Sequence, residues 1–358
     1  MRPDDELAVV DVIALALILL AALAGWAGAW LVGRFAGPLG LLQSPNPRSS
    51  HVRPTPGGGG VGIVVGVSVA GVLAWFDGRV GAQWLAVLGL AGGLALVGLC
   101  DDRQPLPARW RLLAQALVCA ALLWLTGPGL AASGLPASGL PASGPLVPGL
   151  PVLGQALLLL GALWWLNLFN FMDGIDGIAG SQAAFMAAAA AALALFASAA
   201  PLSGPVLGLL CVAAASLGFL RLNWPPARVF MGDVGSLWLA FMLLALALST
   251  TAQDLVRPAA WAVLAALFVS DASVTLARRL LTGQRWTEAH RSHAYQRLAR
   301  RLGGHRPVTR LAIVINLVWL LPLAALAQMR PDWAWASVAA AYLPLLAGAA
   351  ALGAGRPV

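Results

Sequence analysis

Long apolar runs, separated by short polar breaks, occupy almost the whole chain. A helix needs roughly 20 predominantly apolar residues to cross about 30 Å of hydrocarbon. The pattern therefore predicts an all-α polytopic membrane bundle of eleven transmembrane helices, with no separate soluble domain between them. The predicted spans are residues 8–32, 60–76, 82–99, 111–126, 152–170, 180–200, 204–220, 236–250, 258–278, 308–328 and 333–350.

The composition agrees with a chain solvated mainly by lipid. Hydrophobic residues make up 60% of the sequence, charged residues make up 10%, and the mean hydropathy is +0.82. These values exclude an ordinary soluble domain. The net charge of +8 does not indicate a nucleic-acid partner, because the arginines flank apolar spans and form no continuous basic face.

The arginines also indicate how the bundle is oriented. With the N-terminus outside and the C-terminus cytoplasmic, 18 of the 22 arginines fall on the cytoplasmic side, in agreement with the positive-inside rule. We predict one integral membrane domain over residues 1–358. Within it, residues 128–151 are predicted as a low-complexity external loop and residues 279–307 as a cytoplasmic loop with a His/Arg motif.

Two adjacent carboxylates, Asp101 and Asp102, follow the third predicted span. They repel each other and lose hydration at a membrane boundary unless a cation or a proton compensates, which favours a functional pair. Arg111, nine residues further on, could return positive charge toward a phosphate near this loop. The alternatives are a solvated helix end and an arginine that only anchors the orientation.

Asn167, Asn170 and Asp173 recur every three residues, and Asp176 follows. If the span continues as a helix, these amides and carboxylates would stack along one face. Such a face suits Mg²⁺, which prefers oxygen ligands and takes only one or two protein groups. Asp233, within Gly-Asp-Val-Gly-Ser, is the best additional ligand. Each Asp-Gly pair can instead form an ordinary turn.

The last polar loop contains His290 and His293 with Arg291 between them. At helical spacing the two histidines would share a face, from which one could donate a hydrogen bond to a phosphate oxygen. A zinc site is a weaker interpretation because the pattern completes no tetrahedral ligand set. A solvated basic loop is the remaining alternative.

Two further features lie in or beside the spans. Asp271 is inside the ninth predicted span, where a charge is costly, so it is predicted to face the bundle interior and to support Arg278 or Arg279. The four glycines at residues 57–60 lack the lysine of a phosphate-binding loop. We interpret them as allowing a tight entry into the second span.

Taken together, the motifs resemble the polyprenyl-phosphate N-acetylhexosamine-1-phosphate transferase family, glycosyltransferase family 4. The resemblance spans most of the chain. It is carried by His51 with the Pro-Thr-Pro and glycines after it, by Asp101-Asp102, by Asn-x-x-Asn-x-x-Asp-Gly-x-Asp-Gly from Asn167 to Gly177, and by Phe-x-Gly-Asp-x-Gly-Ser from Phe230 to Ser236.

This resemblance implies a transfer that depends on Mg²⁺, with Mn²⁺ as a substitute. The donor would be a UDP-N-acetylamino sugar, the acceptor undecaprenyl phosphate and the leaving group UMP. The enzyme would lie in the bacterial inner membrane with its site facing the cytoplasm, in contact with membrane lipid and compatible with a homo-oligomer. The implied residues are Asp101, Asp102, Asp173 and Asp176 for catalysis, His51, Arg111, Asn167, His290, Arg291 and His293 for substrate binding, and Asn170 and Asp233 for the metal.

The final loop indicates which branch of the family the chain resembles. It has only His290 and His293, followed by Tyr295, where many relatives carry a denser histidine cluster. The pattern looks most like the branch that starts O-antigen or related surface polysaccharides. A phospho-N-acetylmuramoyl-pentapeptide-type transferase of peptidoglycan synthesis is the alternative within the family, and an ion-coupled secondary transporter is the alternative outside it.

Overall fold

The computed structural model describes residues 11–43, 54–132, 150, 152–197, 202–284 and 290–357. The first half contains α1 Val12–Leu39, β1 Leu42–Gln43, β2 Thr55–Pro56, α2 Val61–Phe76, α3 Ala82–Arg103, α4 Ala108–Ala132, α5 Val152–Phe171 and α6 Ile178–Ala197. The second half contains α7 Gly204–Asn223, α8 Asp233–Ala252, α9 Pro258–Leu281, α10 Ala294–Arg301, α11 His305–Val314, a π-helical segment Ile315–Leu320, α12 Leu321–Met329, a short 3₁₀ turn Pro331–Trp333 and α13 Ala334–Ala351.

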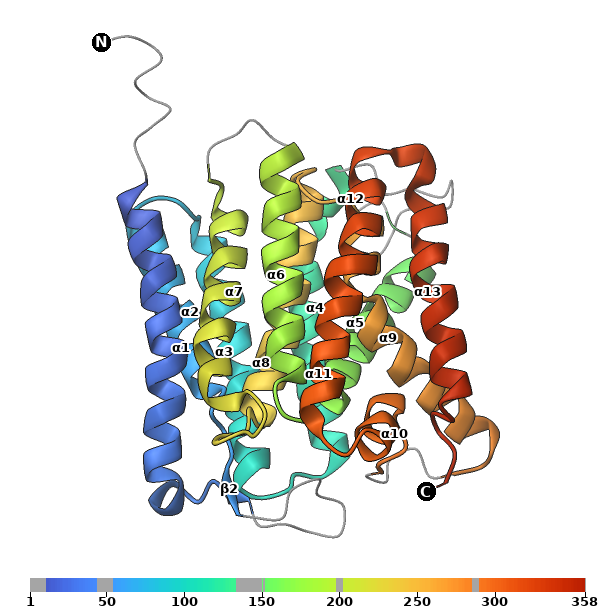
Figure 1. The fold of residues 1–358 in the computed structure, drawn as a ribbon. Coiled ribbons are helices and arrows are strands. Elements are labelled where there is room, and N and C mark those ends of the chain that lie inside the picture. The colour runs from blue at the N-terminus through green and yellow to red at the C-terminus, as the bar shows by residue number, and fades with distance from the viewer. Residues whose placement is uncertain are drawn as a thin grey trace, which may run out of the picture.

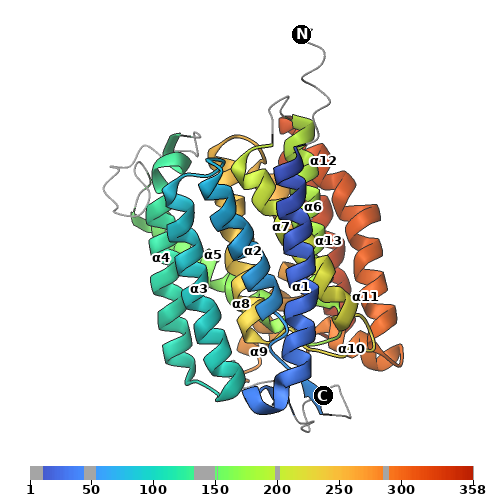
Figure 2. The ribbon, with the colours of Figure 1, turned by 90° about the vertical axis from the view of Figure 1, so that its left-hand side faces the viewer.

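The long helices run side by side in one bundle (Figures 1 and 2). In the part of the chain that the structure describes, ten segments are long and apolar enough to cross a membrane, and α2 is a shorter apolar helix of 16 residues. The segment from α11 to α12 counts as one of the ten. Each predicted span overlaps a helix in its described residues, so the predicted all-α polytopic bundle is confirmed.

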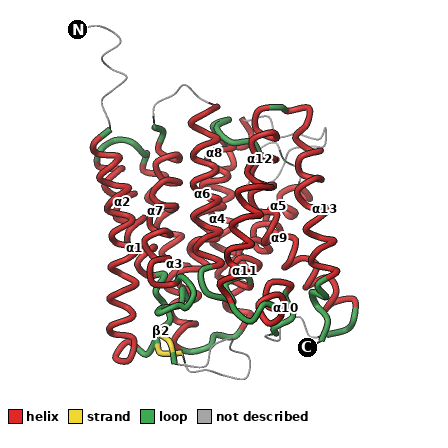
Figure 3. Tube along the Cα trace, in the orientation of Figure 1, coloured by secondary structure: helices red, strands yellow, loops and turns green. Residues whose placement is uncertain are grey.

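The connecting loops with polar residues gather at one end of the bundle. Figure 3 shows the loops, β2 and α10 at the end where the C-terminus lies, while α1 begins at the opposite end. We call the end of the bundle that carries β2, α10 and the C-terminus the α10 end. The start of α1 and the last described residues lie at opposite ends of the bundle, which fits an odd number of crossings, whereas the side of the membrane that each end faces stays a prediction.

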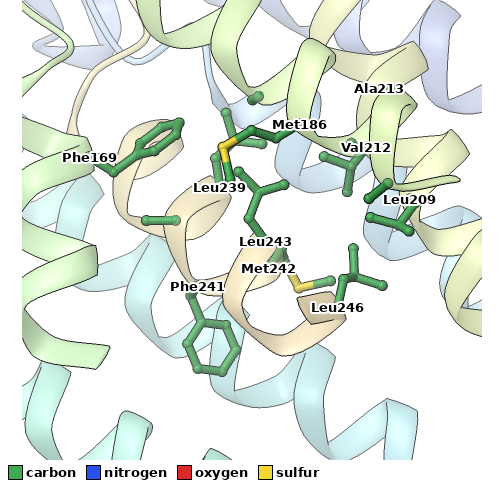
Figure 4. Packing of buried hydrophobic residues seen from close by; sticks show 14 of the residues in the cluster. Phe169, Met186, Leu209, Val212, Ala213, Leu239, Phe241, Met242, Leu243 and Leu246 are labelled. Carbon is green, nitrogen blue, oxygen red and sulfur yellow. The ribbon is translucent and has the colours of Figure 1, made fainter. Parts of the chain in front are cut away.

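Helix α8 forms the centre of the bundle. It packs against α2 to α7 and against α9, and residues 234–243 are all buried. A helix that is apolar on every side belongs in such a position. Figure 4 shows Phe169 of α5 and Met186 of α6 beside Leu239 of α8, with Leu209 of α7 near Leu246. Since α8 begins at Asp233, the central helix brings this carboxylate to the α10 end.

Three predicted boundaries need correction. Helix α5 ends at Phe171, so the predicted helical continuation is wrong for Asp173 and Asp176, which lie in the connection to α6, where Asp176-Gly177 forms a turn. The predicted cytoplasmic loop 279–307 contains the helix α10. Helix α4 continues to Ala132, into the predicted external loop 128–151, most of which lies outside the described residues.

Candidate active site

A cavity of about 250 Å³ opens at the α10 end. Its polar lining includes Asp102 at the end of α3, Asn170 at the end of α5, Asp173 and Asp176 in the turn before α6, and Asp233 at the start of α8. These five residues belong to three motifs far apart in the sequence. The structure therefore brings five of the predicted site residues into one cavity.

Asp102 holds the first turn of α8. Its Oδ1 accepts a hydrogen bond from the backbone N–H of Asp233 at 2.8 Å, and its Oδ2 accepts one from Val234 at 3.1 Å. First-turn N–H groups have no partner inside their own helix, and the positive end of the helix dipole favours a carboxylate there. Gly232 precedes the helix with φ of +76°, and a Cβ at this position would lie 2.5 Å from Asp102 Oδ2. Only glycine fits this approach.

Asn170 joins α5 to the same turn of α8. Its Nδ2 donates to Asp233 Oδ1 at 2.9 Å and to Ser236 Oγ at 2.8 Å. These bonds use the amide nitrogen and leave the amide oxygen as the ligand atom of this side chain. The two residues predicted to bind the metal are thus neighbours, although the sequence separates them by 63 positions.

The charge in the cavity fits a bound cation. Burial and the nearby carboxylates of Asp233, Asp102 and Asp176 raise the pKa of Asp173 well above its usual range. Among the described residues, no group of three or more His, Cys, Asp or Glu side chains forms a metal cage by itself. Mg²⁺ does not need one, since it binds one or two protein oxygens together with substrate phosphates and water. Asn170 and Asp233 therefore fit as its protein ligands.

Arg111 lies beside this acidic group. It forms an ion pair with Asp101, and its guanidinium nitrogen is 3.6 Å from Asp233 Oδ2. Asp101 also accepts a hydrogen bond from the backbone N–H of Leu106. Neither Asp101 nor Arg111 is among the residues that line the cavity, so this ion pair lies beside the cavity, where Asp101 holds Arg111 close to Asp233. Arg111 is one-third exposed, which leaves it accessible to a phosphate.

The turn that carries Asp176 is fixed by contacts that the sequence did not reveal. Asp176 Oδ2 accepts from the backbone N–H of Ala227 at 2.9 Å, and His305 Nδ1 of α11 lies 3.2 Å from Asp176 Oδ1. Asn223 accepts from the backbone N–H of Gly177 at 2.9 Å and donates to Val229 O at 2.9 Å. These contacts are made in the tertiary fold, and neither His305 nor Asn223 belongs to a recognisable motif.

The remaining predicted site residues lie away from the cavity lining. Asn167 donates to Gln115 Oε1 and to Leu163 O, both at 2.7 Å, so it faces α4. His290, Arg291 and His293 do not line the cavity either. His51, which was predicted to bind substrate, lies outside the described residues.

The two histidines of the last loop are adjacent for a reason other than helical spacing. Helix α10 begins only after His293, so the prediction that both histidines share a helical face is wrong. Their rings nevertheless stack with centroids 5.0 Å apart. Burial, together with the charges of His293 and Arg279, lowers the pKa of His290 to about 4. His290 is therefore neutral at pH 7.

The fold and the cavity define an integral membrane protein with its polar chemistry concentrated at one end of a helical bundle. Residues 84–251 match the model of Glycosyl transferase family 4. The match covers all five cavity residues named above. The resemblance drawn from the motifs is thus confirmed. The chain is a glycosyl-1-phosphate transferase, which sets aside the transporter alternative.

Three similar proteins carry functional names. The chain is 29% identical to the probable undecaprenyl-phosphate N-acetylglucosaminyl 1-phosphate transferase of Bacillus subtilis, over 75% of this chain and 72% of that protein. It is 28% identical to the decaprenyl-phosphate N-acetylglucosaminephosphotransferase of Mycolicibacterium smegmatis, over 78% and 73%. It is 32% identical to the phospho-N-acetylmuramoyl-pentapeptide-transferase of Granulibacter bethesdensis, over 55% and 59%.

Proposed function

We propose that the protein transfers an N-acetylated amino sugar 1-phosphate from a UDP-sugar to undecaprenyl phosphate and releases UMP. The product would start an O-antigen or related cell-envelope polysaccharide. Two of the similar proteins are named for the transfer of N-acetylglucosamine 1-phosphate to a polyprenyl phosphate. The peptidoglycan branch is the second candidate, because another similar protein is named for it.

The observation that carries the proposal is the joint placement of Asn170 and Asp233 in the acidic cavity, with the guanidinium of Arg111 3.6 Å from Asp233. The reaction brings together two anionic phosphates, so the site must mainly cancel charge repulsion. Mg²⁺ bound by Asn170 and Asp233 would supply positive charge to the diphosphate of the donor. Arg111 is positioned to donate to a phosphate oxygen at the rim of the same cavity.

The carboxylates of this site are better suited to positioning than to proton removal. A phosphate monoester has a second pKa of about 6, so the acceptor is mostly a dianion at neutral pH. Both oxygens of Asp102 already accept backbone hydrogen bonds. We infer that Asp102 fixes the start of α8 and that the acceptor phosphate attacks without an obligatory protein base.

The proposed location is the bacterial inner membrane with the cavity facing the cytoplasm. The arginines of the described loops support this orientation. Arg79, Arg257 and Arg330 lie at the helix connections opposite the α10 end, whereas most other described arginines lie at or near the α10 end. A fluorescent protein fused after the C-terminus should fold and fluoresce in cells, since it would remain in the cytoplasm. A dark but stable fusion would contradict the orientation.

The proposal is tested with purified protein in lipid nanodiscs. Undecaprenyl phosphate is mixed with UDP-N-acetylglucosamine, UDP-N-acetylfucosamine or UDP-N-acetylmuramoyl-pentapeptide, and UMP release is measured with Mg²⁺ and with EDTA. One of the first two donors should react, and EDTA should stop the reaction. Turnover of the pentapeptide donor alone would favour the peptidoglycan branch, and no release from any donor would refute the proposal.

A variant links the activity to the metal ligands. Asp233→Ala should abolish UMP release at every Mg²⁺ concentration, whereas Asp254→Asn, at the far end of α8, should behave like the wild type. Asp254 is exposed and lies at the opposite end of the bundle from the cavity. Full activity of Asp233→Ala with a normal Mg²⁺ titration would show that Asp233 does not bind the metal.

A further inference from the structure

Asp271 is a buried carboxylate inside the membrane-spanning helix α9, and both of its oxygens face α10. Oδ1 accepts a hydrogen bond from the backbone N–H of Ala294 at 2.9 Å, and Oδ2 accepts one from the backbone N–H of Tyr295 at 2.8 Å. His293 Nδ1 lies 3.3 Å from Oδ1, and the Thr275 hydroxyl donates to the same oxygen at 3.1 Å. Asp271 therefore binds the N-terminus of α10.

The predicted support of Arg278 or Arg279 by Asp271 is wrong. Arg278 donates instead to Ala354 O, and Arg279 donates to Gln284 Oε1. The reason is that the first N–H groups of α10 have no partner within their own helix and lie next to Asp271, where they satisfy the carboxylate directly. A charge inside a spanning helix persists only when it is paired in this way.

The contacts of α10 continue from Asp271 to the cavity. The Tyr295 hydroxyl donates to Phe171 O, the last residue of α5, at 2.9 Å. The next residue, Gln296, lines the acidic cavity. Burial and the carboxylates of Asp271 and Asp173 raise the pKa of Tyr295 well above its usual range, so its hydroxyl stays protonated and remains a donor.

Gly174 shows how closely α10 approaches the segment between α5 and α6. A Cβ at this position would lie 2.0 Å from the Tyr295 hydroxyl and 3.1 Å from Gln296 Nε2. A side chain at residue 174 would therefore push α10 away from the turn that carries Asp173 and Asp176. Gly174 and Gln296 both line the cavity, so this contact forms part of its wall.

We propose that Asp271 is a positioning residue of the transferase: it holds α10 by its N-terminus, so that Tyr295 contacts the end of α5 and Gln296 forms one wall of the cavity. Asp271 does not line the cavity itself and acts through α10. Only the activity measurement rests on the proposed function, because the position of α10 can be measured without turnover.

The first experiment measures α10 directly in Asp271→Asn. The asparagine keeps the size of the side chain but offers one acceptor oxygen where the carboxylate offers two, so one N–H of α10 loses its partner. Amide hydrogen exchange at residues 294–297 should become at least about tenfold faster. Asp332→Asn, in the exposed 3₁₀ turn at the opposite end, is the matched control and should leave exchange unchanged.

A second readout separates positioning from general stability. The chain has four histidines, so histidine-selective ¹⁵N labelling gives few signals. In Asp271→Asn the His293 signal should shift, while the signal of His305, whose partner is Asp176, should stay. The donor kcat/KM should fall at least about tenfold with little change in Tm, in line with the loss of a charge-assisted hydrogen bond.

Gly174→Ala tests the same contact from the other side. It should reduce kcat/KM to a similar extent and leave the contact between His293 and Asp271 intact, so the His293 signal should stay in place. Unchanged exchange and unchanged transfer in Asp271→Asn would overturn the proposal. So would a lower Tm with shifts of all four histidine signals, because Asp271 would then stabilise the whole bundle. If the wild type transferred nothing, the proposed function would fail while the exchange and histidine results still decided the role of Asp271.

Discussion

Asp102→Asn is the most informative single change at the cavity. In the wild type, the carboxylate accepts hydrogen bonds from the first two N–H groups of α8, at 2.8 and 3.1 Å. The asparagine oxygen can keep one of these bonds, but its NH₂ group then faces the other N–H. The variant therefore loses one charge-assisted hydrogen bond and the interaction of a full negative charge with the helix N-terminus.

The size of the effect follows from these two contributions. A hydrogen bond to a charged group contributes about 1.5–3 kcal/mol, and a charge at a helix N-terminus contributes about 0.3–1 kcal/mol. Together they give a loss of about 2–4 kcal/mol in the interaction that holds the start of α8, which corresponds to a roughly 30- to 900-fold lower kcat/KM if the transition state bears the whole loss. The deficit should be constant from neutral to alkaline pH, where the wild-type carboxylate is charged, because a positioning role does not depend on proton removal.

The assay is UMP release as a function of donor concentration, Mg²⁺ concentration and pH, with thermal unfolding measured in the same nanodiscs. Asp254→Asn is the control with the same chemical change. A deficit that disappears as the pH rises would refute the reasoning, because it would show that Asp102 removes a proton. Wild-type activity with wild-type Mg²⁺ affinity would refute it as well, since the contact with α8 would then be dispensable.

Three further predictions concern single residues. Gly232→Ala should lower both Tm and transfer more than Gly283→Ala. Both positions have positive φ, but only at Gly232 would the new methyl group meet other atoms, including Asp102 Oδ2 at 2.5 Å. Equal effects of the two substitutions would contradict this reasoning. Arg111→Gln should raise the donor KM more than Arg111→Lys, which keeps the charge, and equal KM values would exclude a charge role. The pKa of His290 is lowered to about 4, so between about pH 4 and 6.5 the folded state binds fewer protons than the unfolded state. The contribution of neutral His290 to the stability of the folded state is therefore complete above about pH 6.5 and is lost as the pH falls toward 4. The Tm difference between wild type and His290→Gln should shrink as the pH falls over this range, and a constant difference would contradict the lowered pKa of His290.

The spans could be predicted from the sequence because length and hydropathy are local properties. The clustering of Asn170 and Asp233 could be anticipated only through the family resemblance, since nothing in the local pattern joins α5 to α8. Local pattern also misled where two rules competed. The three-residue spacing after Asn167 suggested a longer helix, but the turn preference of Asp-Gly prevailed beyond Phe171.

Long-range polar contacts were out of reach for a different reason. Asp271 has its partners 22 to 24 positions later, and His305 meets Asp176 across 129 positions. No periodicity encodes such pairs, because they depend on how whole helices are placed. Gln296 reached the cavity wall in the same way, as a consequence of where α10 is held.

The central position of α8 links the depth of Asp233, the proposed metal ligand, to apolar packing far from the cavity. Asp233 is the first residue of a helix that is enclosed by its neighbours from Val234 to Leu243, and a helix advances about 1.5 Å for each residue. A core substitution that shifts α8 along its axis by a fraction of this step would move Asp233 relative to Asn170, which belongs to another helix. The packing of Leu239 and Met242 thus fixes the position of Asp233 along the helix axis. Substitutions of these two residues should weaken Mg²⁺ affinity before they unfold the bundle.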